Sequence, residues 1–220
     1  MKAIVCSQFG PIAHLKMGDL PVPLPQADEV LIEVEAAGVN FPDVLIVQGK
    51  YQFRPSLPFS PGAEVVGKVL SLGAQVGRFS VGDRVVAATG WGGFAQQVAV
   101  HHSQVTALPE GVRSEAAAAL GVAYGTALHA LQDRGGLQKG EQLLVLGAAG
   151  GVGLAAVQLG KLLGANVIAA ASDAEKLALC QAAGADAVVN YAHPQWRDEV
   201  KAWGREGGVD VVLDPEDGVG

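Results

Sequence analysis

Residues 146–165 read LGAAGGVGLAAVQLGKLLGA. This glycine-rich run follows a short apolar segment and opens a stretch with helical periodicity. A strand, a glycine loop and a helix in this order, within a βαβ unit of about 30 residues, are typical of dinucleotide-binding folds. The unit predicted here extends from Leu143 to Ala171. The run therefore predicts a turn at which the phosphates of a nucleotide meet the N-terminus of a helix.

The glycines of this run match the dinucleotide-binding pattern G-x-G-x-x-G only in part. In the register nearest the strand, Ala148 takes the place of the first glycine, and Gly151-x-Gly153-x-x-Ala156 fits a looser register. We expect Gly150 to let the backbone approach a pyrophosphate and Gly153 to let the helix pack closely on the strand. A tight turn without a ligand is the alternative, but the βαβ context favours binding. The predicted loop contacts are Ala148, Gly150, Gly151, Val152 and Gly153.

Strands and helices alternate from Lys139 onward. The predicted strands are Leu143–Leu146, Val167–Ala171, Ala187–Asn190 and Val209–Asp214. The predicted helices between them are Gly151–Leu163, Asp173–Ala183 and Pro194–Trp203. Strict alternation of this kind predicts an α/β domain with a parallel, doubly wound sheet.

The first part of the chain is rich in predicted strands, which Gly and Pro clusters separate. These strands are Ala3–Val5, Glu29–Ala37, Glu64–Ser71, Arg84–Ala88 and Phe94–Val100. Helical propensity begins at Ser114, a predicted N-cap, and Gly121 and Gly125 interrupt it, which predicts two short helices. We therefore expect two domains, a β-rich one over residues 1–124 and an α/β one over residues 125–220.

Composition argues against several other classes of protein. The formal net charge is −7 and no stretch is strongly basic, so no nucleic-acid partner is expected. Cys6 and Cys180 are too few for a disulfide framework or a four-cysteine zinc lobe. The N-terminus lacks an apolar signal core, and no apolar run approaches the ~18 residues of a membrane span. We expect a cytoplasmic protein without a membrane partner.

The longer stretch Gly140–Lys161, GEQLLVLGAAGGVGLAAVQLGK, resembles the quinone oxidoreductase/zeta-crystallin signature of the medium-chain dehydrogenase/reductase superfamily. Residues 36–52 (AAGVNFPDVLIVQGKYQ) and 57–69 (LPFSPGAEVVGKV) resemble the GroES-like N-terminal domain of that family. Residues 123–128 (AYGTAL) resemble its inter-domain helix. The resemblance covers the whole chain and implies a GroES-like β-rich domain followed by a partial Rossmann sheet.

The same resemblance bears on metal binding. Asn40 and Ala63 stand where zinc-dependent relatives would have cysteine and histidine. His101 and His102 are adjacent at the end of a predicted strand, so their side chains would point to opposite faces and make poor joint ligands. We therefore expect no metal. The resemblance implies instead hydride transfer from a nicotinamide to a quinone or an α,β-unsaturated carbonyl.

Three residues are candidates for the catalytic site by their family position: Asn40, Asp43 and Tyr51. A hydrogen-bond donor would stabilise the negative charge that develops on the acceptor's oxygen. Asn40 is a candidate to bond the substrate or the nicotinamide, and Tyr51 to donate to that oxygen or to stack on the ring. Asp43 either orients its neighbours or forms an Asx turn after Pro42. Thr126 either contacts the nicotinamide side of the cofactor or bonds its own helix backbone.

The end of the second strand of the α/β domain bears on the choice between NADPH and NAD. An NAD site usually has an acidic residue there, about 20 residues past the glycines. Ser172 takes that place, Lys176 follows in the next helix, and Tyr191 follows the third strand. These side chains are candidates to receive a 2′-phosphate and the adenine, as the resemblance implies for NADPH. In the alternative, Asp173 binds the ribose of NAD, or merely begins a helix. We expect NADPH.

The predicted function is zinc-independent, NADPH-dependent reduction of a small-molecule quinone or enone. Two alternatives stay open: an enoyl- or acryloyl-CoA reductase, and a nucleotide-binding protein without turnover. The full dinucleotide fold has six strands ordered 3-2-1-4-5-6, whereas four are predicted here. We therefore expect a C-terminally truncated member, with a bare edge at the fourth strand and a nicotinamide pocket that lacks one wall. The resemblance implies a homodimer for the full-length parent.

Overall fold

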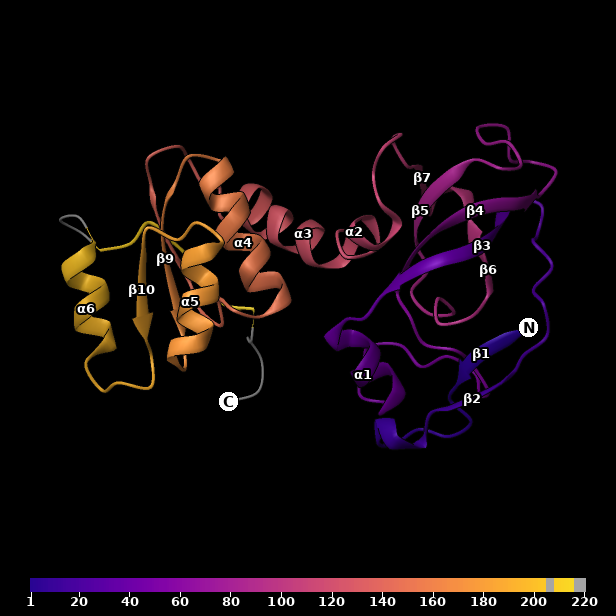
Figure 1. Ribbon diagram of the computed structural model, residues 1–220, viewed down its shortest axis with the longest axis horizontal. Helices are drawn as coiled ribbons and strands as arrows, with labels where there is room; N and C mark the ends of the chain where they lie inside the picture. The colour runs from indigo at the N-terminus through magenta and orange to yellow at the C-terminus, as the bar shows by residue number, and fades with distance from the viewer. Residues whose placement is uncertain (205–207, 216–220) are drawn as a thin grey trace. The chain divides into compact units, whose positions relative to one another are not determined.

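The computed structural model describes residues 1–204 and 208–215 of the chain. The chain forms two compact units, Met1–Val122 and Ala123–Gly220. Strands dominate the first unit, whereas strands and helices alternate in the second (Figure 1). Among the described residues, no helix is long and apolar enough to cross a membrane.

The first unit is built on a five-stranded antiparallel sheet in the order β6-β3-β4-β5-β7. Its strands are β3 (Glu29–Gly38), β4 (Glu64–Leu72), β5 (Arg84–Ala88), β6 (Gln97–His101) and β7 (Val105–Ala107). Alternate residues of these strands are mostly β-branched, and their side chains form one buried cluster. The cluster contains Val30, Ile32, Val65, Val69, Val85, Ala87, Val98, Val100 and Val105. A hairpin of β1 (Lys2–Val5) and β2 (Lys16–Asp19) completes the strands of this unit.

Several features of the first unit differ from the sequence-based expectation. The strand predicted from Phe94 begins only at Gln97, because the Phe94 and Gln96 N–H groups bond outside the sheet, to Pro61 and Lys2. The patterns also missed β2, β7 and the helix α1 (Phe41–Val47). Two single turns of 3-10 helix, η1 (Ile12–His14) and η2 (His102–Gln104), complete the unit's elements before α2.

Ser114 is not the N-cap that the sequence predicted. It is the first residue of α2 (Ser114–Ala118), and Arg113 is the N-cap. The Ser114 hydroxyl donates to Glu35 Oε2 at 2.6 Å and accepts from an Arg84 guanidinium N–H at 2.8 Å. These tertiary hydrogen bonds engage the hydroxyl, so it does not cap the helix. The second helix, α3 (Gly121–Leu128), begins at Gly121 but runs through Gly125 and continues into the π-helical turn η3 (His129–Arg134).

The second unit contains the predicted parallel sheet, in the order β10-β9-β8-β11. The strands are β8 (Gln142–Val145), β9 (Asn166–Ala171), β10 (Ala187–Asn190) and β11 (Val211–Leu213). The helices between them are α4 (Gly151–Leu162), α5 (Ala174–Ala182) and α6 (Trp196–Trp203). In chain order this is third, second, first and fourth strand, the order of a doubly wound nucleotide-binding sheet.

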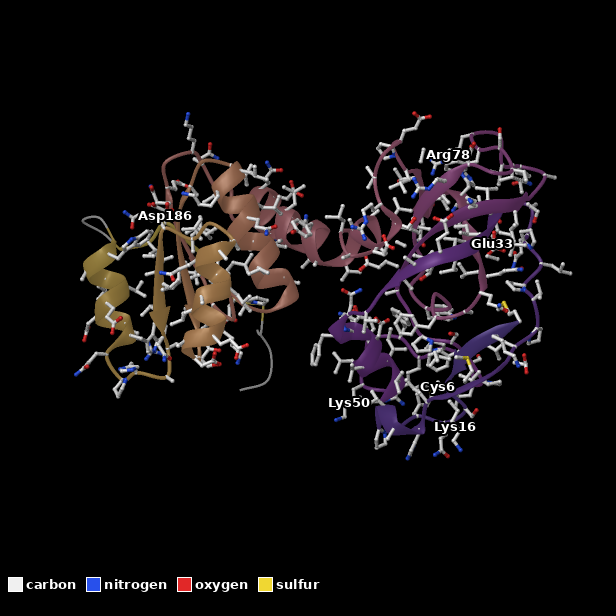
Figure 2. All side chains as sticks on the ribbon, in the orientation of Figure 1. Cys6, Lys16, Glu33, Lys50, Arg78 and Asp186 are labelled. Carbon is white, nitrogen blue, oxygen red and sulfur yellow. The ribbon has the colours of Figure 1, made fainter. Side chains whose placement is uncertain are left out.

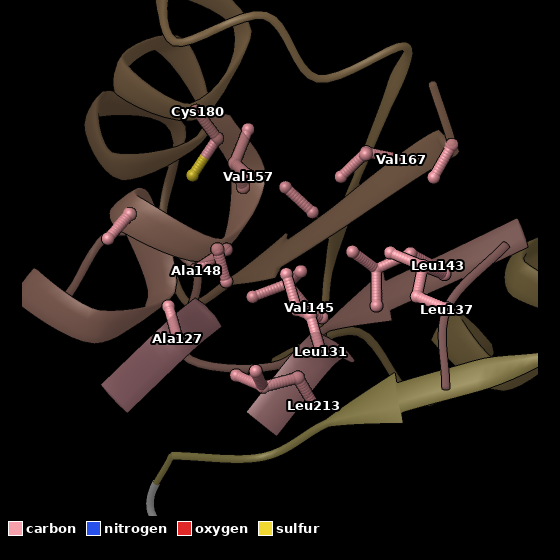
Figure 3. Packing of buried hydrophobic residues seen from close by; sticks show 14 residues of the cluster. Ala127, Leu131, Leu137, Leu143, Val145, Ala148, Val157, Val167, Cys180 and Leu213 are labelled. Carbon is pink, nitrogen blue, oxygen red and sulfur yellow. The ribbon is translucent and has the colours of Figure 1, made fainter. Parts of the chain in front are cut away.

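Both faces of this parallel sheet are buried, as such sheets require. Leu143 and Val145 of β8 pack on one side with Val157 of α4 and Cys180 of α5 (Figure 3). Leu144, between them, packs on the other side in a cluster that includes residues of α6. At the edge of the described sheet, β11 pairs with β8 alone, and Val212 is 53% exposed.

The close approach of α4 to the sheet generates a stability prediction. A Cβ added at Gly153 would lie 2.4 Å from the Gly147 carbonyl oxygen, whereas a Cβ at Gly151 would meet nothing within 4 Å. Gly153→Ala should therefore lower the free energy of unfolding by about 1–3 kcal/mol, because backbone must move to admit the methyl group. Gly151→Ala, two residues away in the same turn, is the matched control and should change it by less than about 1 kcal/mol. Urea unfolding of both variants measures the difference, and equal stabilities would contradict it.

Candidate functional site

The loop between β8 and α4 is held in place by its own backbone. Gly147 has a φ of +53°, a conformation that favours glycine. The Ala148 N–H donates to the Ala170 carbonyl of β9 at 3.0 Å, and the Gly150 N–H donates to the Gly147 carbonyl at 2.9 Å. Gly150 is then the N-cap of α4. Sequence reasoning did not assign the left-handed turn to Gly147, although a glycine directly after a strand was the available signal.

The first residues of α4 have backbone N–H groups that the helix itself does not use. Residues in the first turn of a helix have no intrahelical acceptor for their N–H groups, and these groups lie at the positive end of the helix dipole. Here they belong to Gly151, Val152 and Gly153. Gly150 and Gly151 are exposed, and no atom lies within 4 Å of a Cβ placed at Gly151. A phosphate fits this arrangement, since the exposed Gly150 and Gly151 have no side chains to stand before these N–H groups.

The other predicted loop residues contribute mainly packing. Ala148 is fully buried, and its side chain lies in the cluster shown in Figure 3. Gly153 packs directly on the loop backbone at Gly147 and Ala148, beyond the end of the strand on which it was expected to pack. These two residues therefore set the shape of the loop. Gly150 and Gly151 are exposed, whereas Val152 is half-buried and packs against the same cluster.

A cation and a hydroxyl lie together at the end of β9. The Lys176 Nζ donates to Ser172 Oγ at 2.8 Å and lies 3.0 Å from Asp173 Oδ2. Asp173 is the N-cap of α5, and its Oδ1 accepts from the Lys176 N–H at 3.0 Å. Hydrogen bonds from the Lys176 backbone and ammonium hold the pKa of Asp173 below its ordinary value. Asp173 thus has the helix-start role, and its Oδ2 also accepts from the Ser172 hydroxyl at 3.1 Å, so Ser172, Asp173 and Lys176 form one hydrogen-bonded group.

Two further predicted residues lie in the second unit. The Tyr191 N–H donates to the Ala171 carbonyl at 3.1 Å, which places Tyr191 beside Ser172 at the carboxyl ends of β9 and β10. Thr126 is exposed on α3. Its neighbour Ala127 packs in the same buried cluster as Ala148, so α3 lies against the core beneath the loop.

In the first unit, the Asp43 carboxylate accepts hydrogen bonds from two backbone N–H groups. Its Oδ2 accepts from the Asn40 N–H at 2.8 Å, and its Oδ1 accepts from the Gly62 N–H at 3.1 Å. The first bond closes the N-terminus of α1 and is not an Asx turn after Pro42. Asp43 is 3% exposed, and burial raises the pKa of its carboxyl although both N–H groups oppose this shift. Asp43 therefore orients the residues around it and does not face solvent.

The side chain of Asn40 bonds to a residue that sequence reasoning missed. Its Nδ2 donates to Glu64 Oε1 at 2.8 Å. Glu64 is the first residue of β4 and is 2% exposed. The available signal was a carboxylate at the head of the strand EVVGKVLSL, because a glutamate is almost never fully buried unless it is partnered.

Tyr51 begins a row of aromatic rings. It is half-buried beside Cys6, Ile46 and Phe59, and the exposed Lys50 precedes it at the surface (Figure 2). Its ring meets Phe53 edge-on, with centroids 5.1 Å apart, and Phe53 lies 5.5 Å from Trp91. Phe53 and Trp91 are 38% and 45% exposed. The rings form an exposed apolar surface of the kind that planar ligands contact.

His101 and His102 do not point to opposite faces, as the strand pattern predicted. His101 ends β6, but His102 has already left the strand for η2, and the two rings stack 4.8 Å apart. His101 Nδ1 is 2.7 Å from Ser103 Oγ. In the described parts of the chain, no three His, Cys, Asp or Glu residues are grouped so that they could hold a metal ion.

Comparison with known proteins places both units in one family. The family model for the alcohol dehydrogenase GroES-like domain matches residues 26–110, and that for zinc-binding dehydrogenase matches residues 151–216. Quinone oxidoreductase-like protein 2 of Bos taurus is 40% identical over 215 residues, 97% of this chain. This chain spans 61% of the length of that relative.

Solved structures agree with the sequence matches. The quinone oxidoreductase from Thermus thermophilus, also solved as a complex with NADPH, is 42% identical with a TM-score of 0.84, over 99% of this chain and 68% of that one. CurK enoyl reductase is 32% identical with a TM-score of 0.89, over 99% of this chain and 68% of that one. The predicted resemblance is confirmed, and the chain belongs to the quinone oxidoreductase/zeta-crystallin family of the medium-chain dehydrogenase/reductase superfamily.

Proposed function

We propose that this protein transfers hydride from NADPH to a quinone. The observation that carries the proposal is the loop before α4, where Gly150 and Gly151 are exposed at the helix N-terminus and a Cβ at Gly151 would meet no atom within 4 Å. This arrangement suits the pyrophosphate of a dinucleotide. The name of the similar protein from Thermus thermophilus, and its complex with NADPH, support the same reaction.

The Ser172–Lys176 pair supports NADPH over NADH. A 2′-phosphate at the end of β9 would receive a hydroxyl and an ammonium, which lie 2.8 Å apart. Asp173 already accepts from the Lys176 N–H and pairs with its ammonium, so its carboxylate is engaged in holding α5. Tyr191, beside Ser172, offers a ring for the adenine. A site that provides a positive group at this position selects a phosphate over a bare hydroxyl.

Residues of the first unit would act on the acceptor. NADPH, when bound, supplies the hydride. The Tyr51 hydroxyl would donate a hydrogen bond to the oxygen on which negative charge develops, which lowers the barrier. The rings of Phe53 and Trp91 would contact the planar acceptor and exclude water from it. Asn40 would hold the reacting groups through its side-chain amide. Asp43 would act through Asn40 and Gly62, which it bonds.

A second candidate is reduction of an enoyl thioester. The similarity to CurK enoyl reductase favours it, at 32% identity against 42% for the quinone oxidoreductase. Both reactions deliver hydride to an electron-poor carbon beside a carbonyl, so the phosphate loop serves either one. Oxidation of NADPH measured with 1,4-naphthoquinone and with crotonyl-CoA separates them. Turnover of the thioester alone would favour the second candidate, and tight NADPH binding without turnover of either would indicate a nucleotide-binding protein.

The phosphate loop assignment predicts that charge can abolish binding without harming the fold. Gly151→Asp places a carboxylate where a Cβ meets no atom within 4 Å, at the helix end that an acid stabilises. NADPH affinity measured by calorimetry should fall on the order of 10- to 100-fold, because a like charge would lie beside the pyrophosphate. Ala178→Glu on the exposed side of α5 adds the same charge elsewhere and should leave affinity unchanged. Full affinity in Gly151→Asp, with the fold intact, would refute the loop assignment.

The 2′-phosphate assignment predicts a difference between the two cofactors. Lys176→Gln removes the ammonium, so NADPH affinity should fall by about 10-fold while NADH affinity stays within about twofold of the unmodified protein. Lys201→Gln on α6 is the matched control, with the same change of charge and no expected effect on either cofactor. Parallel calorimetric titrations provide the comparison. Equal losses for NADPH and NADH would show that Lys176 does not meet the 2′-phosphate.

A further inference from the structure

Glu64 is a buried carboxyl group that the proposed reaction has not yet used. It is 2% exposed at the head of β4, and among the described residues it forms no salt bridge. Burial of a charged group is costly unless hydrogen bonds compensate it. Both of its oxygens accept hydrogen bonds, Oε1 from the Asn40 side chain at 2.8 Å and Oε2 from the Val122 N–H at 2.9 Å. One carboxyl group thus joins the Asn40 side chain to the first turn of α3.

The carboxyl group determines how the Asn40 amide is turned. An amide can present either its oxygen or its nitrogen, and only the hydrogen-bond network distinguishes them. A carboxylate only accepts hydrogen bonds, so Asn40 must direct an Nδ2 proton to Glu64. The Asn40 Oδ1 then faces the Asp43 N–H, as the acceptor in the capping box of α1. Asn40 is itself the N-cap of α1, so its backbone is held as well.

The space around the carboxyl group leaves it little freedom. A Cβ at Gly38, the last residue of β3, would lie 2.3 Å from Glu64 Oε1. A Cβ at Gly121, the first residue of α3, would lie 2.7 Å from Oε2. The carboxyl group therefore occupies a slot that exists because two glycines lack side chains. A group held this closely transmits its orientation to the amide that it bonds.

We propose that Glu64 is a positioning residue for hydride transfer, which acts by holding the Asn40 amide in one orientation, between the Glu64 carboxyl group and the Asp43 N–H. The inference rests on the proposed function, because it gives the Asn40 amide a role in the reaction. Glu64 itself touches neither cofactor nor acceptor in this role. Its contribution is the fixed geometry of another side chain, on which transfer rates depend steeply.

A double-mutant cycle tests whether Glu64 acts through Asn40. In Glu64→Gln, the glutamine Nε2 must face either the Val122 N–H, where no hydrogen bond can form, or Asn40, whose amide must then turn over to accept it. With NADPH and 1,4-naphthoquinone, kcat should fall on the order of 10- to 100-fold. The NADPH Kd should stay within about twofold, because the phosphate loop and Glu64 belong to different units. In an Asn40→Ala background, Glu64→Gln should lower kcat by no more than about twofold.

Glu35→Gln is the matched control. Glu35 accepts a hydrogen bond from Ser114 at 2.6 Å in the same unit and bonds neither Asn40 nor Val122. The same chemical change there should leave kcat unaltered. A loss of similar size in Glu35→Gln would mean that any glutamate of this unit affects the rate through stability, and would overturn the proposal.

A reversed pair keeps the test informative if Glu64→Gln alone does not fold. In the double variant N40D/E64Q, the new glutamine donates to the new carboxylate and still accepts from the Val122 N–H. Asn40→Asp alone places two carboxyl groups against each other. The reversed pair should therefore recover at least about tenfold in kcat over Asn40→Asp, since the side chain at position 40 is again held by a hydrogen bond to position 64.

The outcomes separate this inference from the function on which it rests. Quinone turnover by the unmodified protein, together with losses that simply add in the Asn40→Ala background, would show a structural Glu64 and overturn the inference alone. Absence of quinone turnover in the unmodified protein would refute the proposed function and this role with it. A non-additive cycle and a recovery in the reversed pair would establish it.

Discussion

The contact between α4 and the loop that precedes it is the constraint on which the second unit depends. The helix begins so close to the backbone of Gly147 that a single methyl group at Gly153 would lie 2.4 Å from its carbonyl oxygen. Gly150 and Gly151, at the start of the same helix, are exposed and have no side chains that would cover its first N–H groups. Packing and ligand binding thus share one cause, the absence of side chains at neighbouring positions in the first turn of α4.

In the first unit, the corresponding constraint is the burial of two acidic side chains. Asp43 and Glu64 are both almost fully buried, and N–H groups satisfy the oxygens of each. Asn40 takes part in both arrangements, through its backbone with Asp43 and through its side chain with Glu64. Because a half-satisfied buried polar network is costly, each of these residues fixes the others. Asn40, which is proposed to meet the reacting groups, is therefore held by hydrogen bonds at both its backbone and its side chain.

The sequence predicted the second unit more closely than the first, for physical reasons. Its strands are short apolar runs between glycines that end helices, so the patterns found all of the described strands and helices from β8 to β11 with small errors at their ends. In the first unit, the branched residues of FPDVLIV favour a strand, yet Asn40 and Asp43 close a helix there. The burial of Glu64 depends on contacts between segments that are distant in the sequence. The stacking of His101 and His102 depends on where a strand ends. Hydrophobic periodicity predicts neither.

Glu64 also explains why the predicted helix break at Gly121 is needed. The carboxyl group of Glu64 accepts from the Val122 N–H, within the first turn of α3, where a negative group is favoured by the helix dipole. A side chain at Gly121 would displace that oxygen. In a continuous helix from Ser114, the Val122 N–H would instead donate to a carbonyl of the preceding turn. The break between α2 and α3 therefore frees the donor that satisfies a buried acid. The helix break at Gly121 therefore supports the polar network around Asn40.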